Sequence, residues 1–348
     1  MLELFIWLVV GLLGAQLLIL FCLILWKART ISHENNIDEI INSLKPQFID
    51  YLEGRRPSEP NLPKSKNTQA VIMEKMLDEF YSDSYGNLEE RKLNQLAEKY
   101  LAAHYRKTLK RGTWAERINA LYFIEDFYLV SLREDAYQHF LKLKKQDEEF
   151  RQCLRVCASL QEERILPVIT EKEGLSTGFI KELLFRLNES LMGKILEKIE
   201  NNNDIAENVL FAFITFNGEQ KNEPFFSFVE NKIFDERKEV RLKALNSLCN
   251  YGKVSNPSIL DAFFTSSYWE ERMYAAKLTG ACSLPQYKQA LLELLSDPVW
   301  WVRFAAAENI KTFPDGEALL RQVALWDEDA YSRDIAKHML TRKGGIGA

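Results

Sequence analysis

Cysteine and histidine are the side chains in this sequence best suited to metal binding or nucleophilic chemistry. Cys153 and Cys157 stand four residues apart, which places both thiols on one face of a helix. A zinc site needs further ligands, and the histidines are scattered along the chain. The pattern favours buried thiols in a reducing compartment over a metal site or a disulfide framework. The remaining members are Cys22, Cys249, Cys282, His33, His104, His139 and His338.

No catalytic motif stands out in the sequence. It contains no phosphate-binding glycine motif, no HExxH, no GxSxG and no kinase signature. Acidic pairs such as Glu162–Glu163 are typical of solvated surfaces. We therefore expect no enzyme activity, no cofactor, no metal and no small-molecule substrate.

One basic cluster could meet an anionic surface. It consists of Arg106, Lys107, Lys110 and Arg111. A second run of lysines follows at positions 142, 144 and 145. Anionic lipid, an acidic partner, or solvent alone are the three interpretations. The net charge of −5 excludes general nucleic-acid binding.

A second set of arginines recurs at a fixed spacing. The separations between Arg241, Arg272, Arg303 and Arg333 are 31, 31 and 30 residues. Arg117 lies 124 residues before Arg241, which is four times 31. Weaker copies surround Arg151, Lys181 and residues 206–213. A constant period in this range is typical of stacked helical hairpins.

Each copy predicts a first helix with the arginine and small residues, a turn, and a second helix rich in leucine. Alanines such as Ala305, Ala306 and Ala307 are predicted contacts between neighbouring helices. The first helices are expected to begin at capping residues. These predicted caps are Asp235, Asp297 and Asp327, with Ser267 and Glu270 in the copy around Arg272.

These copies resemble HEAT repeats. Asp297, Val302, Arg303, Ala305, Ala306 and Ile310 match the family pattern best. The resemblance covers about 110–342 and implies an all-α fold, a right-handed α-solenoid of HEAT-like helical hairpins. It also implies a ladder of hydrogen bonds between successive repeats. The residues assigned to that ladder are Asp235, Arg241, Arg272, Asp297, Arg303, Asp327 and Arg333. Anion binding is the alternative role for these arginines.

Tryptophans occupy one position in three of the copies. Trp114, Trp269 and Trp300 each lie three residues before the arginine of their copy. They either pack over the preceding turn or form anchors for a protein partner, since aromatic residues are enriched at binding hot spots. Trp301, Tyr331 and Tyr268 are the further aromatic candidates for a protein-binding face.

The N-terminal segment predicts a membrane span. Residues 4–26 carry no charge and a single polar side chain, Gln16, and are long enough to cross about 30 Å of hydrocarbon. The run is too long for a cleaved signal peptide and lacks a basic leader. Lys27 and Arg29 follow it and no basic residue precedes it. We therefore expect a single-pass protein of the cell membrane with its N-terminus outside and its C-terminal domain in the cytoplasm.

Five segments are predicted in all. An amphipathic helix is expected over 36–53, and it would lie on the bilayer, pack on the body or engage a partner. A proline-containing linker or extended strap is expected to follow at 54–67. The predicted segments are an extracytoplasmic N-terminus (1–3), the transmembrane helix (4–26), a juxtamembrane region (27–68), the α-solenoid (69–342) and a flexible tail (343–348).

The sequence predicts a membrane-tethered cytoplasmic scaffold. Stacked hairpins usually present a long surface to proteins. The expected partner is an integral membrane protein, with a membrane glycosyltransferase or another envelope-assembly component as one such class. The alternative is an enzyme with a site in the concave face, because the family also includes bilin lyases and DNA glycosylases.

Overall fold

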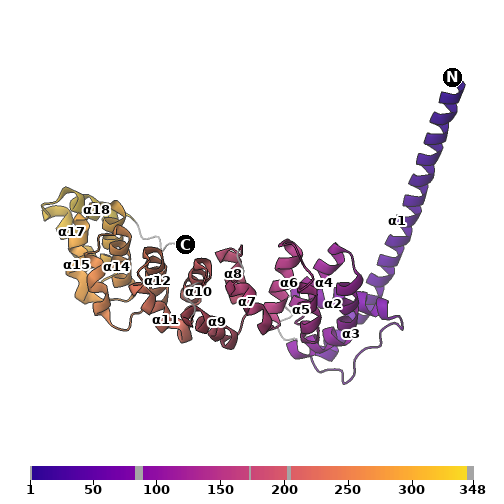
Figure 1. The fold of residues 1–348 in the computed structure, drawn as a ribbon, viewed down its shortest axis with the longest axis horizontal. Helices are drawn as coiled ribbons and strands as arrows, with labels where there is room; N and C mark the ends of the chain where they lie inside the picture. Colours follow the sequence, from indigo (N-terminus) through magenta and orange to yellow (C-terminus); the bar gives the residue numbers. More distant parts are fainter. Residues whose placement is uncertain (1, 83–88, 172–173, 202–204, 343–348) are drawn as a thin grey trace. The chain divides into compact units, whose positions relative to one another are not determined.

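The computed structural model describes residues 2–82, 89–171, 174–201 and 205–342, and its described part is all helix and connecting loops without a strand (Figure 1). The predicted all-α solenoid is therefore confirmed as the fold. The predicted tail at 343–348 lies outside the described residues. The chain divides into two compact units, Met1–Glu162 and Glu163–Ala348.

The first unit contains one long helix and five shorter ones. They are α1 (Leu2–Leu52), α2 (Lys66–Ser82), α3 (Glu90–Arg111), α4 (Trp114–Asp126), α5 (Arg133–Phe140) and α6 (Glu148–Ser159).

The second unit is built from shorter helices that alternate along the chain between first and second helices of the hairpins. They are α7 (Leu166–Glu171), α8 (Thr177–Leu184), α9 (Glu189–Asn201), α10 (Glu207–Gln220), α11 (Phe226–Asn231), α12 (Lys238–Tyr251), α13 (Asp261–Phe264), α14 (Trp269–Ala281), α15 (Lys288–Glu293), α16 (Trp300–Ile310), α17 (Gly316–Trp326) and α18 (Ala330–Thr341). Short 3-10 turns lead into or out of several of them, at Val130–Leu132, Glu163–Ile165, Glu223–Phe225, Lys232–Phe234, Pro257–Leu260, Pro285–Tyr287 and Leu294–Ser296.

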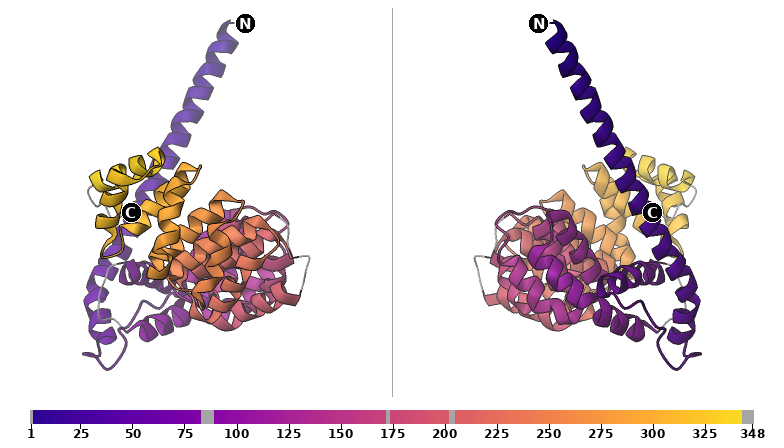
Figure 2. Two further views of the ribbon diagram at one scale, coloured as in Figure 1. Left: turned by 90° about the vertical axis from the view of Figure 1, so that its left-hand side faces the viewer. Right: turned by 90° about the vertical axis from the view of Figure 1, so that its right-hand side faces the viewer.

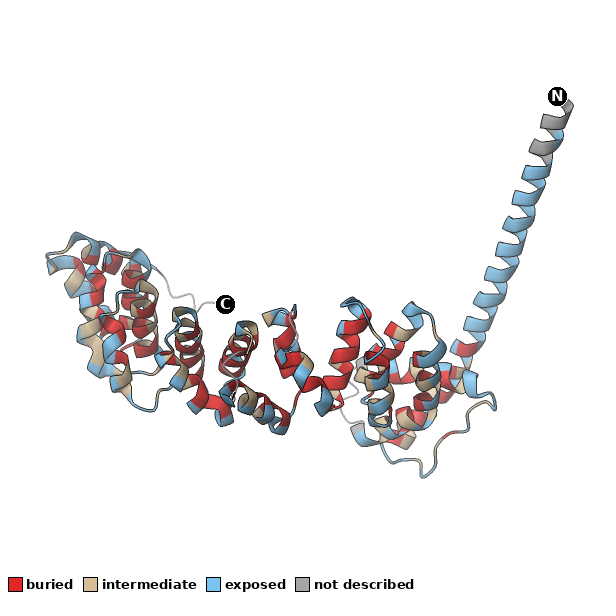
Figure 3. Cartoon of the chain, viewed as in Figure 1, coloured by how far each residue is buried: buried red, intermediate tan, exposed pale blue. Residues whose placement is uncertain are grey.

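Helix α1 joins two segments that the sequence separates. It runs unbroken from the apolar N-terminal stretch through the expected amphipathic helix, with Pro46 inside it (Figure 2). Its second part packs on the body, since Ile37, Ile41, Phe48 and Leu52 are buried. Among the described residues, this is the helix long and apolar enough to cross a membrane, and its side chains from residue 11 to residue 36 are exposed (Figure 3).

The proline-containing segment after α1 is bound to the body. The Tyr100 hydroxyl and Lys99 Nζ both donate to the Glu59 carboxylate, the latter over 2.6 Å, and Pro60 is buried. This segment is therefore an extended strap against α3 rather than a free linker.

Small residues set the spacing of the second unit. Ala305, Ala306 and Ala307 in α16 are all buried. A Cβ atom added at Gly280 of α14 would lie 1.9 Å from Asn309 Oδ1 of α16. The first helices of successive hairpins therefore approach more closely than larger side chains would permit.

Candidate functional site

The predicted caps lie one turn outside the helices. The carboxylates of Asp235, Asp297 and Asp327 each accept the amide two residues further on, at 3.0, 2.8 and 2.8 Å. Helices α12 and α16 begin only after these turns, at Lys238 and Trp300. The expectation that these aspartates are N-caps is therefore wrong, because each forms a local turn before the helix.

The predicted cap of the copy around Arg272, Ser267, is also not the N-cap of its helix. Ser266, not Ser267, accepts the amide of Tyr268, at 3.1 Å, and Tyr268 is the N-cap of α14. A full capping box forms elsewhere, between Thr113 and Glu116 at the start of α4.

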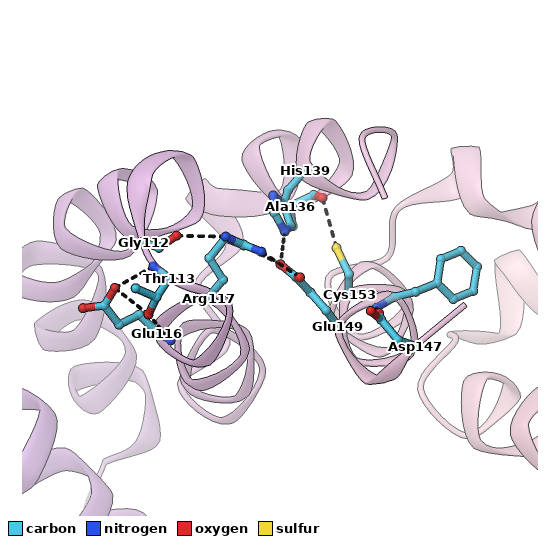
Figure 4. Close-up of polar contacts among 10 residues, drawn as sticks. Gly112, Thr113, Glu116, Arg117, Ala136, His139, Asp147, Glu149 and Cys153 are labelled. Carbon is cyan, nitrogen blue, oxygen red and sulfur yellow. Dashed lines mark hydrogen bonds and ion pairs between the residues drawn. The ribbon is translucent and has the colours of Figure 1, made fainter. Parts of the chain in front are cut away.

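The ladder begins in the first unit, where α4, α5 and α6 meet (Figure 4). Arg117 Nε and Nη2 donate to the two oxygens of Glu149, at 2.5 and 2.9 Å. His139 Nε2 lies 2.8 Å from Glu149 Oε1. Burial raises the pKa of Glu149, but the bonds from Arg117 and His139 outweigh burial and leave that pKa below its usual range.

Two further rungs connect first helices in the second unit. Arg241 Nε donates to Glu271 Oε1 over 2.7 Å. Arg272 Nε and Nη2 bind Asp297 Oδ2 and Oδ1, at 2.6 and 3.0 Å. The structure thus brings Arg272 and Asp297 together, as the resemblance implies.

Every ladder arginine also holds the turn before its own helix. Arg241, Arg303 and Arg333 each donate from Nη1 to two backbone carbonyls five and six residues earlier, at 2.7 to 3.1 Å. This contact gives each of the three a structural role inside its own repeat, and it is the hydrogen-bonded contact that Arg303 and Arg333 make in the described part of the chain.

Not every predicted rung has its predicted acid. Asp235 pairs with Arg237 of its own turn, and that contact, working against burial, lowers the pKa of Asp235. The acids that sequence reasoning missed are Glu149 and Glu271. Glu149 lies two residues before Arg151, and Glu271 lies one residue before Arg272. Each follows the arginine that it binds by about one repeat period. An acid at that offset was the available signal.

The aromatic candidates gather on α16 and α18. Trp300 packs edge-on against Trp301, with ring centroids 4.7 Å apart, and stacks on Phe304 at 5.0 Å. The Tyr331 ring lies over the Arg303 guanidinium, 4.8 Å from Cζ to centroid. Trp301 and Tyr331 are 56% and 62% exposed. We call Trp300, Trp301, Phe304 and Tyr331 the aromatic surface.

The other aromatic candidates, Tyr268, Trp269 and Trp114, are not part of this surface. Tyr268 covers Lys238 and Arg241, with distances of 4.9 and 5.7 Å to its ring centroid. Trp269 is half-buried in the first turn of α14, whereas Trp114 in the first unit is 52% exposed. The tryptophan three residues before the arginine is thus exposed to solvent to different degrees in different copies.

The basic cluster on α3 is partly neutralised. Arg106 and Lys110 both reach Asp135 of α5, at 2.8 and 3.4 Å. Lys107 and Arg111 are exposed. Two of the four cations therefore have a partner within the unit.

A groove crosses the first helices of the second unit. It has a volume of about 600 Å³ and lies across α8, α10, α12 and α14. Its lining includes Phe211, Leu242 and Met273, which follow one another at intervals of 31 residues. The ion pairs Lys181–Glu219 and Lys238–Glu270 flank it.

The cysteines are free thiols. Cys153 and Cys157 are buried side by side on α6, and Cys153 donates to the Ala136 carbonyl over 3.3 Å. In the described part of the chain, no three histidine, cysteine or acidic residues group closely enough to hold a metal ion.

The helices define an all-α helical-repeat protein. Residues 289–313, which run from α15 through α16, match the family model described as HEAT repeat, which supports a HEAT-like helical-repeat family for the chain. No curated protein sequence matches the chain. The crystal structure of an engineered protein is similar at 14% identity and a TM-score of 0.34, over 80% of this chain and 85% of that chain.

Proposed function

We propose that this protein is a scaffold anchored in the cell membrane, whose helical repeats bind an integral membrane protein on the cytoplasmic side. A helical-repeat fold suits protein binding because it offers an extended surface. An envelope-assembly component, such as a membrane glycosyltransferase, is the partner class that the resemblance suggests. We propose no enzymatic step.

The continuity of α1 carries the anchoring part of this proposal. Its first part exposes large apolar side chains, including Leu17, Leu18 and Phe21 at 61–66%. Such a surface is unfavourable in water, at about 25 cal/mol per Å². One face of its second part is buried against the body. One helix thus joins a lipid-compatible surface to the repeats without a break.

The aromatic surface supports the binding part of the proposal. Tryptophan and tyrosine are among the residue types that dominate interface energies, and Trp301 and Tyr331 of this surface are both exposed. Exposed apolar surface of this kind is also unfavourable unless something covers it.

Topology is the first test. In intact cells, a protease added outside should leave the repeats undigested, and it should digest them in inside-out vesicles. Digestion of the repeats in intact cells would contradict the cytoplasmic placement.

Partner recovery is the second test. The full chain, extracted in mild detergent after in-cell crosslinking, should co-purify one integral membrane protein. Trp300→Ala with Trp301→Ala should lose it, whereas Phe185→Ala, a 67% exposed aromatic at the end of α8, should keep it. Equal recovery from all three proteins would remove the aromatic surface from the proposal.

A further inference from the structure

Two rungs of the ladder have the same inner contacts and differ at one edge. Arg241 and Arg303 both hold two backbone carbonyls through Nη1. Both carry a tyrosine ring over the guanidinium, Tyr268 and Tyr331 respectively. One face of each guanidinium and its Nη1 atom are therefore occupied in the same way.

The outer edge is filled in only one of them. Glu271 accepts from Arg241 Nε over 2.7 Å and also accepts from Ser266 Oγ over 2.5 Å. Arg303 Nε and Nη2 donate to no residue in the described part of the chain, although Arg303 is only 9% exposed. These two nitrogens are not among the fully buried unpaired atoms, so the edge reaches solvent.

A serine stands where the missing acid would be. Ser332 directly precedes Arg333, as Glu271 directly precedes Arg272. Aligned on the arginines, Ser332 therefore takes the position in its copy that Glu271 takes in the copy around Arg272. The Ser332 side chain is fully buried, and its Oγ has no hydrogen-bond partner. A buried hydroxyl without a partner is costly unless a ligand completes it.

The second acid that could fill the edge makes no contact with it. Asp327 corresponds to Asp297, which binds Arg272. Asp327 Oδ1 accepts the Asp329 amide, and no ion pair joins Asp327 to Arg303 in the described residues. Asp329 accepts the Ser332 amide, and Glu328 is exposed. Arg303 thus lacks the carboxylate that completes Arg117, Arg241 and Arg272.

We propose that Arg303 is the receptor for a carboxylate side chain, Asp or Glu, of the partner protein. The carboxylate takes the place that Glu271 fills on Arg241, with its oxygens on Arg303 Nε and Nη2. The Tyr331 ring covers one face of the Arg303 guanidinium and shields the ion pair from water on that side, which strengthens it. This inference rests on the proposed scaffold function and names the chemistry that its surface recognises.

The first experiment completes the rung from within the chain. Ser332→Glu supplies the missing carboxylate, and Ser332→Gln is its neutral control of equal size. In the full chain in detergent, the Glu variant should unfold about 3 °C above the Gln variant, the shift expected for about 1 kcal/mol in a unit of this size. Equal or reversed midpoints would show that the Arg303 edge does not accept a carboxylate.

The second experiment adds the carboxylate from outside. The probes are the peptides acetyl-Gly-Glu-Gly-amide and acetyl-Gly-Gln-Gly-amide at constant ionic strength, followed by tryptophan fluorescence of the full chain. The Glu peptide should bind about tenfold more tightly than the Gln peptide, as expected for a charge-assisted pair. Ser332→Glu should abolish that difference and Ser332→Ala should keep it. Equal binding of the two peptides, or no binding, would overturn the proposal.

Failure of this inference and failure of the scaffold function are distinguishable. If Ser332→Glu still recovers the membrane partner while Trp300→Ala with Trp301→Ala loses it, the carboxylate receptor is wrong and the scaffold stands. If the peptides discriminate but no integral membrane protein is recovered, the receptor stands and the scaffold function is wrong.

Discussion

The carboxylate of Asp297 binds Arg272 through both of its oxygens, with Nε–Oδ2 and Nη2–Oδ1 distances of 2.6 and 3.0 Å. The same carboxylate accepts the Val299 amide that leads into α16. One side chain therefore fixes the start of its own helix and the distance to the preceding one. Its side chain is 4% exposed, so little solvent competes for it.

We expect Asp297→Asn to destabilise the second unit by about 3 kcal/mol, because the amide keeps the turn but leaves Arg272 without its buried counter-charge. Urea unfolding followed by circular dichroism measures this. Glu317→Gln is the control, since Glu317 forms a 3.8 Å pair with Arg321 in which both side chains are mostly exposed. Equal midpoints for both variants would show that the rung contributes nothing.

We expect the Glu149 rung to make the first unit sensitive to acid. The pKa of Glu149 is lowered on balance, so its ionised form stabilises the fold above the ordinary carboxyl range of about 4.5 and that contribution is lost as the pH falls through the folded value. Glu149→Gln should therefore be less stable than the wild type at pH 7, and the gap should shrink below pH 4.5. A gap that is constant with pH would contradict this.

We expect slow alkylation of the thiols in the second unit. Burial raises the pKa of Cys249 to about 12 and that of Cys282 to about 11. At pH 8 the reactive thiolate is therefore scarce, and iodoacetamide should modify both at least about 100-fold more slowly than in urea-unfolded chain. Mass spectrometry of timed samples measures both rates. Comparable rates in the folded and unfolded chain would show that these thiols are not protected.

We expect Phe48→Ala to loosen α1 from the body. Phe48 is fully buried, and its loss should cost about 3 to 4 kcal/mol through a cavity between α1 and the first unit. Thermal unfolding in detergent measures the loss. Ile31→Ala is the matched control on the same helix, since Ile31 is 45% exposed and should leave the midpoint unchanged.

The repeat itself is readable from the sequence because its period survives in Arg241, Arg272 and Arg303. The rung acids are harder to predict. Glu149, Glu271 and Asp297 stand two, one and six residues before the arginine position of their own copies, yet all reach the preceding arginine. Side-chain length and direction compensate for the different offsets, and neither is visible in a linear pattern.

The sequence pattern also does not predict that α1 continues as a helix between Trp26 and Ile37. This stretch is polar and solvent-exposed, so it carries no apolar periodicity to indicate a helix. The helix continues through it because both of its ends are already helical, and propagation costs less than a new start.

That uninterrupted stretch gives α1 the properties of a rigid spacer. The ten residues from Lys27 to Asn36 span about 15 Å at a helical rise of 1.5 Å per residue. If the helix crosses the bilayer at 4–26, the body of the first unit is held at a set distance from the lipid, which a flexible linker would not do. Only partners whose docking segments extend to that distance from the bilayer are then within reach. The length of the helical segment Lys27–Asn36 would therefore itself select among the proteins of the same membrane.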